Sequence, residues 1–255
     1  MRSAVFRFYG ELRDFLPPRR RGVTFEQQFF GAPSVKDLIE ALGAPHPEVD
    51  LVLADGEAVD FGWAVRDGAR VAVFPAFGAI DVGPVSRVRA PPLREVRFVL
   101  DGHLGRLARY LRMAGFDALW ERGARDEDLA RTSVRDGRIL VTRDVGLLKR
   151  REVTHGCWVR STDPTRQLAE LVRRFDLARS AGPFRRCLRC NALLERVAKV
   201  DVAARLPPRV RERHDEFTRC PSCERIYWSG THRQRMERTL AAAARLNSAA
   251  HRTSA

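Results

Sequence analysis

Four of the five cysteines form two C-x-x-C pairs, which are the most specific chemical signal in the chain. The pairs are CLRC at 187–190 and CPSC at 220–223, with 29 residues between the inner cysteines. Each pair can present two thiolates to one ion, and two pairs complete the closed tetrahedral set of structural zinc. A redox-active pair is the alternative, but two copies favour metal in a reducing compartment. The pattern predicts a structural Zn²⁺ bound by Cys187, Cys190, Cys220 and Cys223.

A second group of candidate residues is acidic. Two short apolar runs each precede an aspartate. RFVL at 97–100 is followed directly by Asp101, and ILVT at 139–142 is followed, after one residue, by Asp144. Both runs are typical of buried parallel strands, and ligands of such sheets bind beyond the carboxyl ends of the strands. Carboxylates brought together there repel each other, so a cation such as Mg²⁺ or Mn²⁺ is expected between them.

The helix predicted between these strands offers further carboxylates. Asp126, Glu127 and Asp128 fall in its first turn, where acidic residues also stabilise the helix dipole without binding anything. Both interpretations stay open, as does the choice between Asp126 and Asp128. Asp163 precedes another predicted helix and is interpreted as its cap, and the lone Cys157 is interpreted as a small core residue.

The chain is strongly basic, with 46 Lys and Arg residues against 32 Asp and Glu residues and a formal net charge of +14. Residues 179–255 hold 17 of the basic residues and only 7 of the acidic ones. This surplus favours a polyanionic partner, although a merely soluble basic surface is the alternative. The candidate phosphate contacts beside the acidic positions are Arg106, Arg143, Lys149 and Arg150.

Helical spacing places Arg106, Arg109 and Arg112 opposite the apolar side of a helix predicted after residue 103. This row is interpreted as a solvated face, with phosphate contact as the alternative. No apolar run approaches the length of a membrane span, and the N-terminus lacks the apolar core of a signal peptide. We therefore expect a cytoplasmic protein without a membrane partner.

The predicted elements divide the chain into parts with different patterns. Residues 1–78 run strand, strand, helix, strand, strand, the helix being capped by Ser34 and ended by Gly43, and this order predicts a small α+β domain. Residues 96–178 alternate strands with helices, which predicts an α/β unit with a mostly parallel sheet. The expected boundaries are 1–78, a Pro-rich linker at 79–95, 96–178, a zinc ribbon at 179–236, and a basic, disordered tail at 237–255.

Two resemblances extend this interpretation. The segments LDGHLGRLARYLRMAGFDALW and DEDLARTSVRDGRILVTRDVGLLKRR, with the cysteine pairs, resemble the PIN-like ribonuclease family named for the C-terminal domain of the exonuclease Mut-seven, over about residues 96–236. FRFYGELRDFL, SVKDLIEALG and VRDGARVAVFPAF resemble a ubiquitin-like, sulfur-carrier-type β-grasp domain. The first resemblance implies a three-layer PIN-like sheet with a zinc ribbon, RNA as substrate, and Mg²⁺ or Mn²⁺ held by carboxylates. It matches Asp101 to the first-strand aspartate, Asp144 to that of the T-R-D motif, and the helical acidic position to Asp126 or Asp128.

The leading hypothesis is thus a metal-dependent, endonucleolytic ribonuclease with Asp101, Asp126, Asp128 and Asp144 as its candidate catalytic residues. The main alternative is an RNA- or ribosome-binding protein whose acidic site is inactive, and a weaker one is a sulfur-transfer or protein-modifier adaptor. Sulfur carriers act through a free Gly-Gly end, whereas here the chain runs on through Phe77-Gly78. We therefore expect a docking or structural module with an unknown protein partner, and expect that removing residues 1–90 leaves an active fragment.

Overall fold

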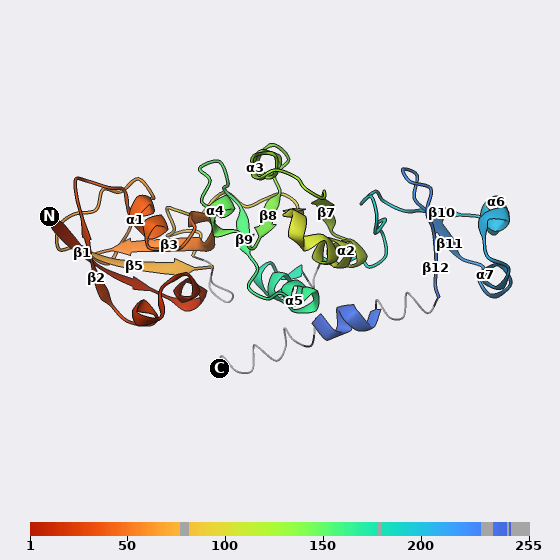
Figure 1. Cartoon of the computed structure of the whole chain (residues 1–255), viewed down its shortest axis with the longest axis horizontal. Helices are drawn as coiled ribbons and strands as arrows, with labels where there is room; N and C mark the ends of the chain where they lie inside the picture. Colours follow the sequence, from red (N-terminus) through yellow and green to blue (C-terminus); the bar gives the residue numbers. More distant parts are fainter. Residues whose placement is uncertain (77–81, 178–179, 231–236, 244, 246–255) are drawn as a thin grey trace. The chain divides into compact units, whose positions relative to one another are not determined.

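The structure is a computed structural model that describes residues 1–76, 82–177, 180–230, 237–243 and 245 (Figure 1). The chain divides into two compact units, each made of two segments. The first comprises Met1–Arg94 and Arg125–Trp158, and the second comprises Glu95–Ala124 and Val159–Ala255. Of the tail predicted to be disordered, residues 237–243 are helical, which contradicts that prediction for this part, and most of the remainder lies outside the described residues.

A mixed five-stranded sheet in the order β2-β1-β5-β3-β4 forms the N-terminal part of the first unit. Strand β1 pairs in parallel with β5, and the remaining pairs are antiparallel. The helix α1 and the sheet enclose one core, whose fully buried side chains include Phe6 and Ile39. The strands and helix are β1 (Arg2–Phe8), β2 (Phe25–Phe29), α1 (Val35–Ala41), β3 (Val49–Ala54), β4 (Glu57–Ala58) and β5 (Arg70–Pro75).

Local signals set the ends of α1. The Ser34 hydroxyl accepts a hydrogen bond from the Asp37 backbone N–H at 3.1 Å, and the Asp37 carboxylate accepts one from the Ser34 N–H at 3.2 Å. Gly43 follows the helix with φ of 123°, a value that favours glycine. Three 3₁₀ turns, η1 (Gly10–Phe15), η2 (Pro18–Arg20) and η3 (His46–Glu48), join the elements. The predicted α+β domain and its helix cap are confirmed.

The first unit also contains a parallel strand pair from the middle of the chain. Strand β8 (Ile139–Thr142) pairs with β9 (Gly156–Trp158), and all four residues of β8 are buried, as its apolar run predicts. Two helices, α3 (Asp126–Arg135) and α4 (Val145–Leu148), lie before and after β8 in sequence.

Direct contacts connect this strand pair to the N-terminal sheet domain. The Lys149 ammonium donates to the Glu40 carbonyl at 2.6 Å, and His46 Nε2 lies 2.7 Å from the Val153 carbonyl. From the segment expected to be a linker, the Ser86 hydroxyl donates to the Asp50 carbonyl at 2.6 Å. The N-terminal domain and residues 125–158 therefore form one packed body. We now expect that removing residues 1–90 destabilises residues 125–158, contrary to the expectation from the sequence that the remaining fragment stays active.

The second unit has its own parallel pair and two flanking helices. Strand β6 (Arg97–Leu100) pairs with β7 (Asp117–Trp120), and a 3₁₀ turn, η4 (Gly102–Leu104), leads into α2 (Gly105–Met113). Helix α5 (Pro164–Arg174) begins at Asp163, whose carboxylate accepts from the backbone N–H groups of Thr165 and Arg166. The cap predicted at Asp163 and the α/β pattern are thus confirmed.

A small antiparallel sheet of the second unit, in the order β10-β11-β12, accompanies the cysteine pairs. The first pair precedes β10, and the second lies between β11 and β12. The insert between the pairs packs Val202 and Leu206 against Phe217 of this sheet, which gives the segment a small core of its own. The elements are β10 (Glu195–Val197), α6 (Lys199–Val202), η6 (Ala203–Arg205), α7 (Pro208–Arg213), β11 (Phe217–Arg219) and β12 (Ile226–Trp228).

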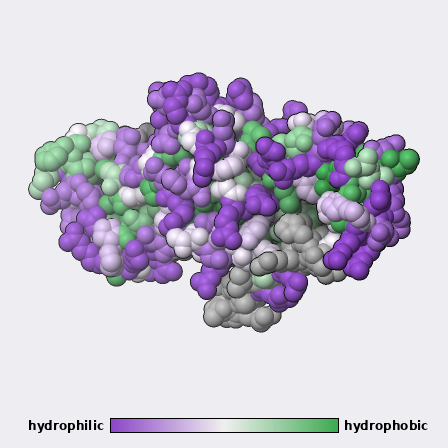
Figure 2. Space-filling model, turned by 45° about the vertical axis from the view of Figure 1, so that its right-hand side comes forward, coloured by the Kyte–Doolittle hydropathy of each residue, from purple (hydrophilic) through white to green (hydrophobic). Residues whose placement is uncertain are grey.

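Among the described residues, none of the helices has the length and apolar content needed to cross a bilayer. Hydrophilic side chains cover most of the face shown in Figure 2.

Candidate metal centres

The four paired cysteines converge on one point. Their sulfur atoms all lie within 4.8 Å of one another, with separations of 3.3 Å for Cys190–Cys220 and 3.5 Å for Cys187–Cys223. Sulfur atoms around one zinc ion with 2.3 Å bonds lie about 3.8 Å apart, whereas a disulfide requires about 2.05 Å. The set therefore fits a tetrahedral Zn²⁺ site, and Cys157, buried in β9 of the other unit, takes no part in it.

Two turns of the same form present these sulfurs. In the first, the Asn191 N–H donates to the Cys187 carbonyl at 3.0 Å, and in the second, the Glu224 N–H donates to the Cys220 carbonyl at 2.9 Å. Both closing residues have positive φ, 73° for Asn191 and 55° for Glu224. Each C-x-x-C segment therefore closes on itself through a local hydrogen bond that brings its two sulfurs to the same side.

A tyrosine hydroxyl supports the first turn. Tyr227 Oη lies 3.1 Å from Cys187 Sγ and accepts from the Leu188 N–H at 3.2 Å. Burial raises the pKa of the Cys187 thiol, but the hydrogen bonds from Tyr227 and from backbone N–H groups outweigh burial and lower that pKa to about 6. A low pKa favours the thiolate form that binds metal. At Cys220 burial prevails and raises the pKa to about 12.

A buried arginine reaches the same turn from α2. Arg112 Nε donates to the Ala118 carbonyl at 2.8 Å, and its Nη1 donates to the carbonyls of Arg189 at 2.8 Å and Leu188 at 3.3 Å. Only 3% of Arg112 is exposed, so its placement on a solvated helix face was wrong. Burial lowers the pKa of Arg112, and the nearby Cys187 and Cys190 oppose that effect because thiolates favour a neighbouring cation. The guanidinium therefore joins the cysteine turn to α2 and β7 and offsets part of the thiolate charge.

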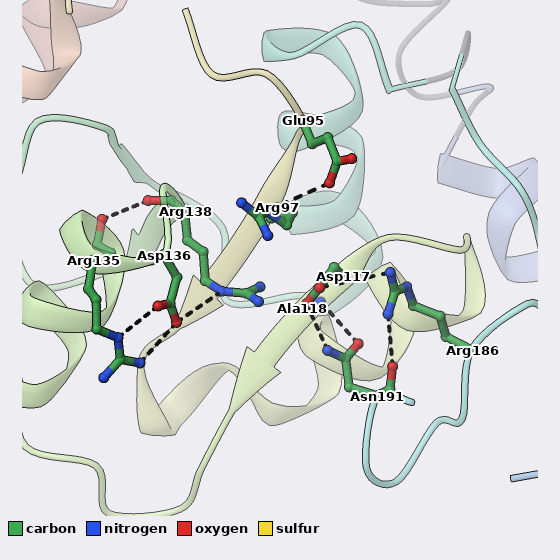
Figure 3. Close-up of polar contacts among 10 residues, drawn as sticks. Glu95, Arg97, Asp117, Ala118, Arg135, Asp136, Arg138, Arg186 and Asn191 are labelled. Carbon is green, nitrogen blue, oxygen red and sulfur yellow. Dashed lines mark hydrogen bonds and ion pairs between the residues drawn. The ribbon is translucent and has the colours of Figure 1, made fainter. Parts of the chain in front are cut away.

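Asn191 makes a second connection between the cysteine turn and β7 (Figure 3). Its Oδ1 accepts from the Ala118 N–H at 3.1 Å, and its Nδ2 donates to Asp117 Oδ1 at 2.8 Å. Arg186 adds a hydrogen bond to the Asn191 carbonyl at 3.0 Å. Sequence reasoning missed Asn191, although an asparagine directly after a C-x-x-C pair is suited to the left-handed backbone found there.

Asp101 lies just beyond β6 in the second unit, as the sequence predicts. Its side chain does not cap the turn η4 that follows. The backbone of the same turn accepts a hydrogen bond from Trp120, whose Nε1 lies 3.1 Å from the Gly102 carbonyl. The backbone just after β6, which carries Asp101, is therefore held by a hydrogen bond from the adjacent strand β7.

Asp144 follows β8 in the first unit and begins α4. Its Oδ1 accepts from the N–H groups of Gly146 at 2.7 Å and Leu147 at 3.3 Å, and its own N–H donates to Thr142 Oγ1 at 2.9 Å. Within the described residues no hydrogen bond is found to Oδ2. Asp144 is exposed, so the second oxygen can bind another ligand while the first caps the helix.

The two acidic candidates on α3 differ in their surroundings. Asp126 is exposed, whereas Asp128 forms ion pairs with Arg125 at 3.0 Å and Arg131 at 3.6 Å. The hydrogen bond from Arg125 lowers the pKa of Asp128. Asp136, directly after α3, is ion-paired with Arg135 at 2.7 Å (Figure 3).

The four candidate phosphate contacts also separate into two kinds. Lys149 is engaged by the Glu40 carbonyl, and Arg150 is ion-paired with Glu152 at 2.9 Å. Arg106 and Arg143 are exposed, and no ion pair or hydrogen bond of either guanidinium is found among the described residues. These two arginines are therefore the better candidates for contacts with a phosphate backbone.

Comparison with known families identifies a family for each of two stretches of the chain. A model of the Mut7-C RNAse domain matches residues 96–240, and a model of the Mut7-C ubiquitin domain matches residues 1–81. The first match covers the β6–β9 segment with both acidic strand ends and the four cysteines. Searches of curated proteins and of solved structures found no match.

Proposed function

Because the chain belongs to the Mut7-C RNAse domain family, we propose that it is a metal-dependent ribonuclease that cleaves RNA phosphodiester bonds endonucleolytically. The observation that carries the proposal is the recurrence of one arrangement: a short buried strand of a parallel pair is followed within two residues by an aspartate, once by Asp101 and once by Asp144. Ligand sites of α/β proteins lie beyond such strand ends.

Asp101, Asp144 and one aspartate of α3 would hold the catalytic ion. We favour Asp126 for the third position, because the Asp128 carboxylate is already engaged by two arginines. Carboxylates suit Mg²⁺ and Mn²⁺, which when bound supply a Lewis acid for the phosphate oxygens and a more acidic water. Arg106 and Arg143 would orient the RNA through its phosphates, without reading its bases.

The zinc ribbon has a different role in this proposal. Four cysteines fill every position of a tetrahedral Zn²⁺, so that ion has no open coordination site for substrate. It would stabilise β10–β12 and the cysteine turns. The basic surplus of residues 179–255 would add salt-dependent attraction for RNA.

The test compares wild type with Asp101→Asn and Asp144→Asn on structured RNAs with Mg²⁺ or Mn²⁺ supplied. We expect cleavage to fall by at least about 100-fold because a metal ligand is weakened, while RNA affinity stays the same or tightens slightly. Asparagine can still cap α4, so Asp144→Asn should fold like wild type, whereas Asp144→Ala should lose about 1 kcal/mol.

Wild-type cleavage rates in both Asn variants would overturn the nuclease assignment for this site. If the wild-type chain binds RNA but cleaves none of the substrates, the RNA- or ribosome-binding alternative takes its place.

A further inference from the structure

Two tryptophans occupy equivalent places beside the two acidic strand ends. Strand β7 ends at Trp120, which is paired with Leu100, the last residue of β6. Strand β9 ends at Trp158, which is paired with Thr142, the last residue of β8. Each tryptophan thus lies next to the residue at which an aspartate-bearing loop begins.

Both indole N–H groups donate to the backbone of these loops. Trp120 Nε1 donates to the carbonyl of Gly102, one residue after Asp101, and Trp158 Nε1 donates to the carbonyl of Arg143, one residue before Asp144. Both distances are 3.1 Å. Since loop carbonyls lack the regular partners of a helix or sheet, such a bond restricts the path of the backbone that carries the carboxylate.

Gly105, the first residue of α2, has no side chain and so leaves space for the Trp120 ring. A Cβ atom there would lie 2.7 Å from the Trp120 ring, closer than such atoms approach each other in proteins. At the other strand end, the Asp144 N–H is bound by Thr142 Oγ1 at 2.9 Å, so the turn before Asp144 is held from two sides.

The N-terminal domain holds Trp158 itself. Glu48, which is 1% exposed, accepts from the Trp158 backbone N–H at 2.6 Å. The Phe15 ring packs against the indole with a centroid separation of 4.8 Å. A buried carboxylate requires such a hydrogen-bond partner.

From these contacts we infer that Trp120 and Trp158 are positioning residues for the loops of Asp101 and Asp144. The N-terminal ubiquitin-like domain is then a fixed support that holds Trp158, and not a tethered adaptor. The inference rests on the proposed function, because it assigns the two aspartates to one catalytic ion. Residues that orient metal ligands change metal affinity or activity by about 10- to 100-fold when they are mutated.

The experiment uses the full chain and the substitutions Trp120→Phe and Trp158→Phe, which keep an aromatic ring but remove the N–H donor. Direct Mn²⁺ binding is measured by electron paramagnetic resonance, and RNA cleavage is measured against Mn²⁺ concentration. We expect each variant to need roughly 10-fold more Mn²⁺, with RNA affinity in the absence of divalent ions unchanged. The matched control is Trp63→Phe, at a partly buried residue that packs against the N-terminal core, and this variant should bind Mn²⁺ like wild type.

A second pair of variants tests the support by the N-terminal domain. Glu48→Gln keeps an oxygen acceptor for the Trp158 N–H and should retain wild-type Mn²⁺ dependence, whereas Glu48→Ala should resemble Trp158→Phe. Thermal unfolding of every variant separates a loss of positioning from a loss of fold.

The outcomes distinguish this inference from the proposed function. Unchanged Mn²⁺ binding in both tryptophan variants, while Asp144→Asn loses it, overturns the inference and leaves the ribonuclease proposal intact. If the wild-type chain neither binds Mn²⁺ nor cleaves RNA, both fail together.

Discussion

The cysteine centre and the acidic strand ends obtain their geometry in different ways. The four sulfurs lie within 4.8 Å of one another and are presented by two local turns of one unit. Asp101 and Asp144 instead follow strands that belong to different units, and each loop is tied to a tryptophan from a neighbouring strand. The cysteine centre is therefore built within one unit, whereas the acidic positions are divided between two units, and the tryptophan beside Asp144 is itself held by Glu48, 110 residues away.

This difference should separate the effects of variants. Changes at the cysteine centre should act on the folding of the ribbon, because a closed metal site contributes folding free energy. Changes at the acidic loops should act on metal affinity and rate while the fold survives. The N-terminal domain belongs with the second group, since Glu48 and Phe15 hold Trp158.

The largest expected effect is the loss of zinc. Chelation or Cys187→Ser/Cys220→Ser should remove the ion and unfold residues 184–230, because structural zinc contributes about 10–16 kcal/mol in small domains. Elemental analysis and hydrogen exchange should show zinc loss and deprotection of β10–β12 with β1–β5 still protected. Cys157→Ser is the control and should keep one zinc per chain. Undiminished zinc in the double variant would remove the assignment of these cysteines.

The next largest expected effect is the loss of stability when the N-terminal domain is removed. A fragment that lacks residues 1–81 loses the partners of Lys149, Val153 and Trp158. Three hydrogen bonds of about 1 kcal/mol each correspond to a lowering of the melting temperature by roughly 6–12 °C. Hydrogen exchange should show the loss at β8–β9 and not at the cysteine turns. A fragment with the thermal stability and Mn²⁺ dependence of the full chain would restore the simpler expectation of independent domains.

A smaller effect is expected at Arg112, which links the cysteine turn to α2 and β7. Arg112→Met leaves the carbonyls of Ala118, Leu188 and Arg189 without this donor and should destabilise the second unit by about 1–3 kcal/mol. Denaturant unfolding of the zinc-loaded protein measures the change. Arg112→Lys should recover only part of it, because one ammonium cannot reproduce the planar guanidinium. Full recovery by lysine would mean that charge alone matters at this position.

Much of the fold follows from local patterns in the sequence. Apolar runs predict the strands, Ser34 and Asp163 predict helix starts, and the cysteine spacing predicts a shared metal site. The structure contains these strands and helix starts, and it brings the four cysteine sulfurs together. Each strand, helix cap and C-x-x-C turn depends on residues within a few positions of one another. The aspartates at the ends of β6 and β8 are predictable for the same reason.

The roles of several polar side chains were decided only by the tertiary structure. Helical periodicity placed Arg112 on a polar face, but the cysteine turn, more than seventy residues later, covers that face and buries the guanidinium. Lys149 stands near Asp144 in sequence, but its ammonium reaches the Glu40 carbonyl because the N-terminal domain packs there. Trp158 has no local signal that links it to Glu48, 110 residues away. Periodicity and capping depend on the nearest residues, whereas a buried polar group depends on whichever distant segment supplies its partner.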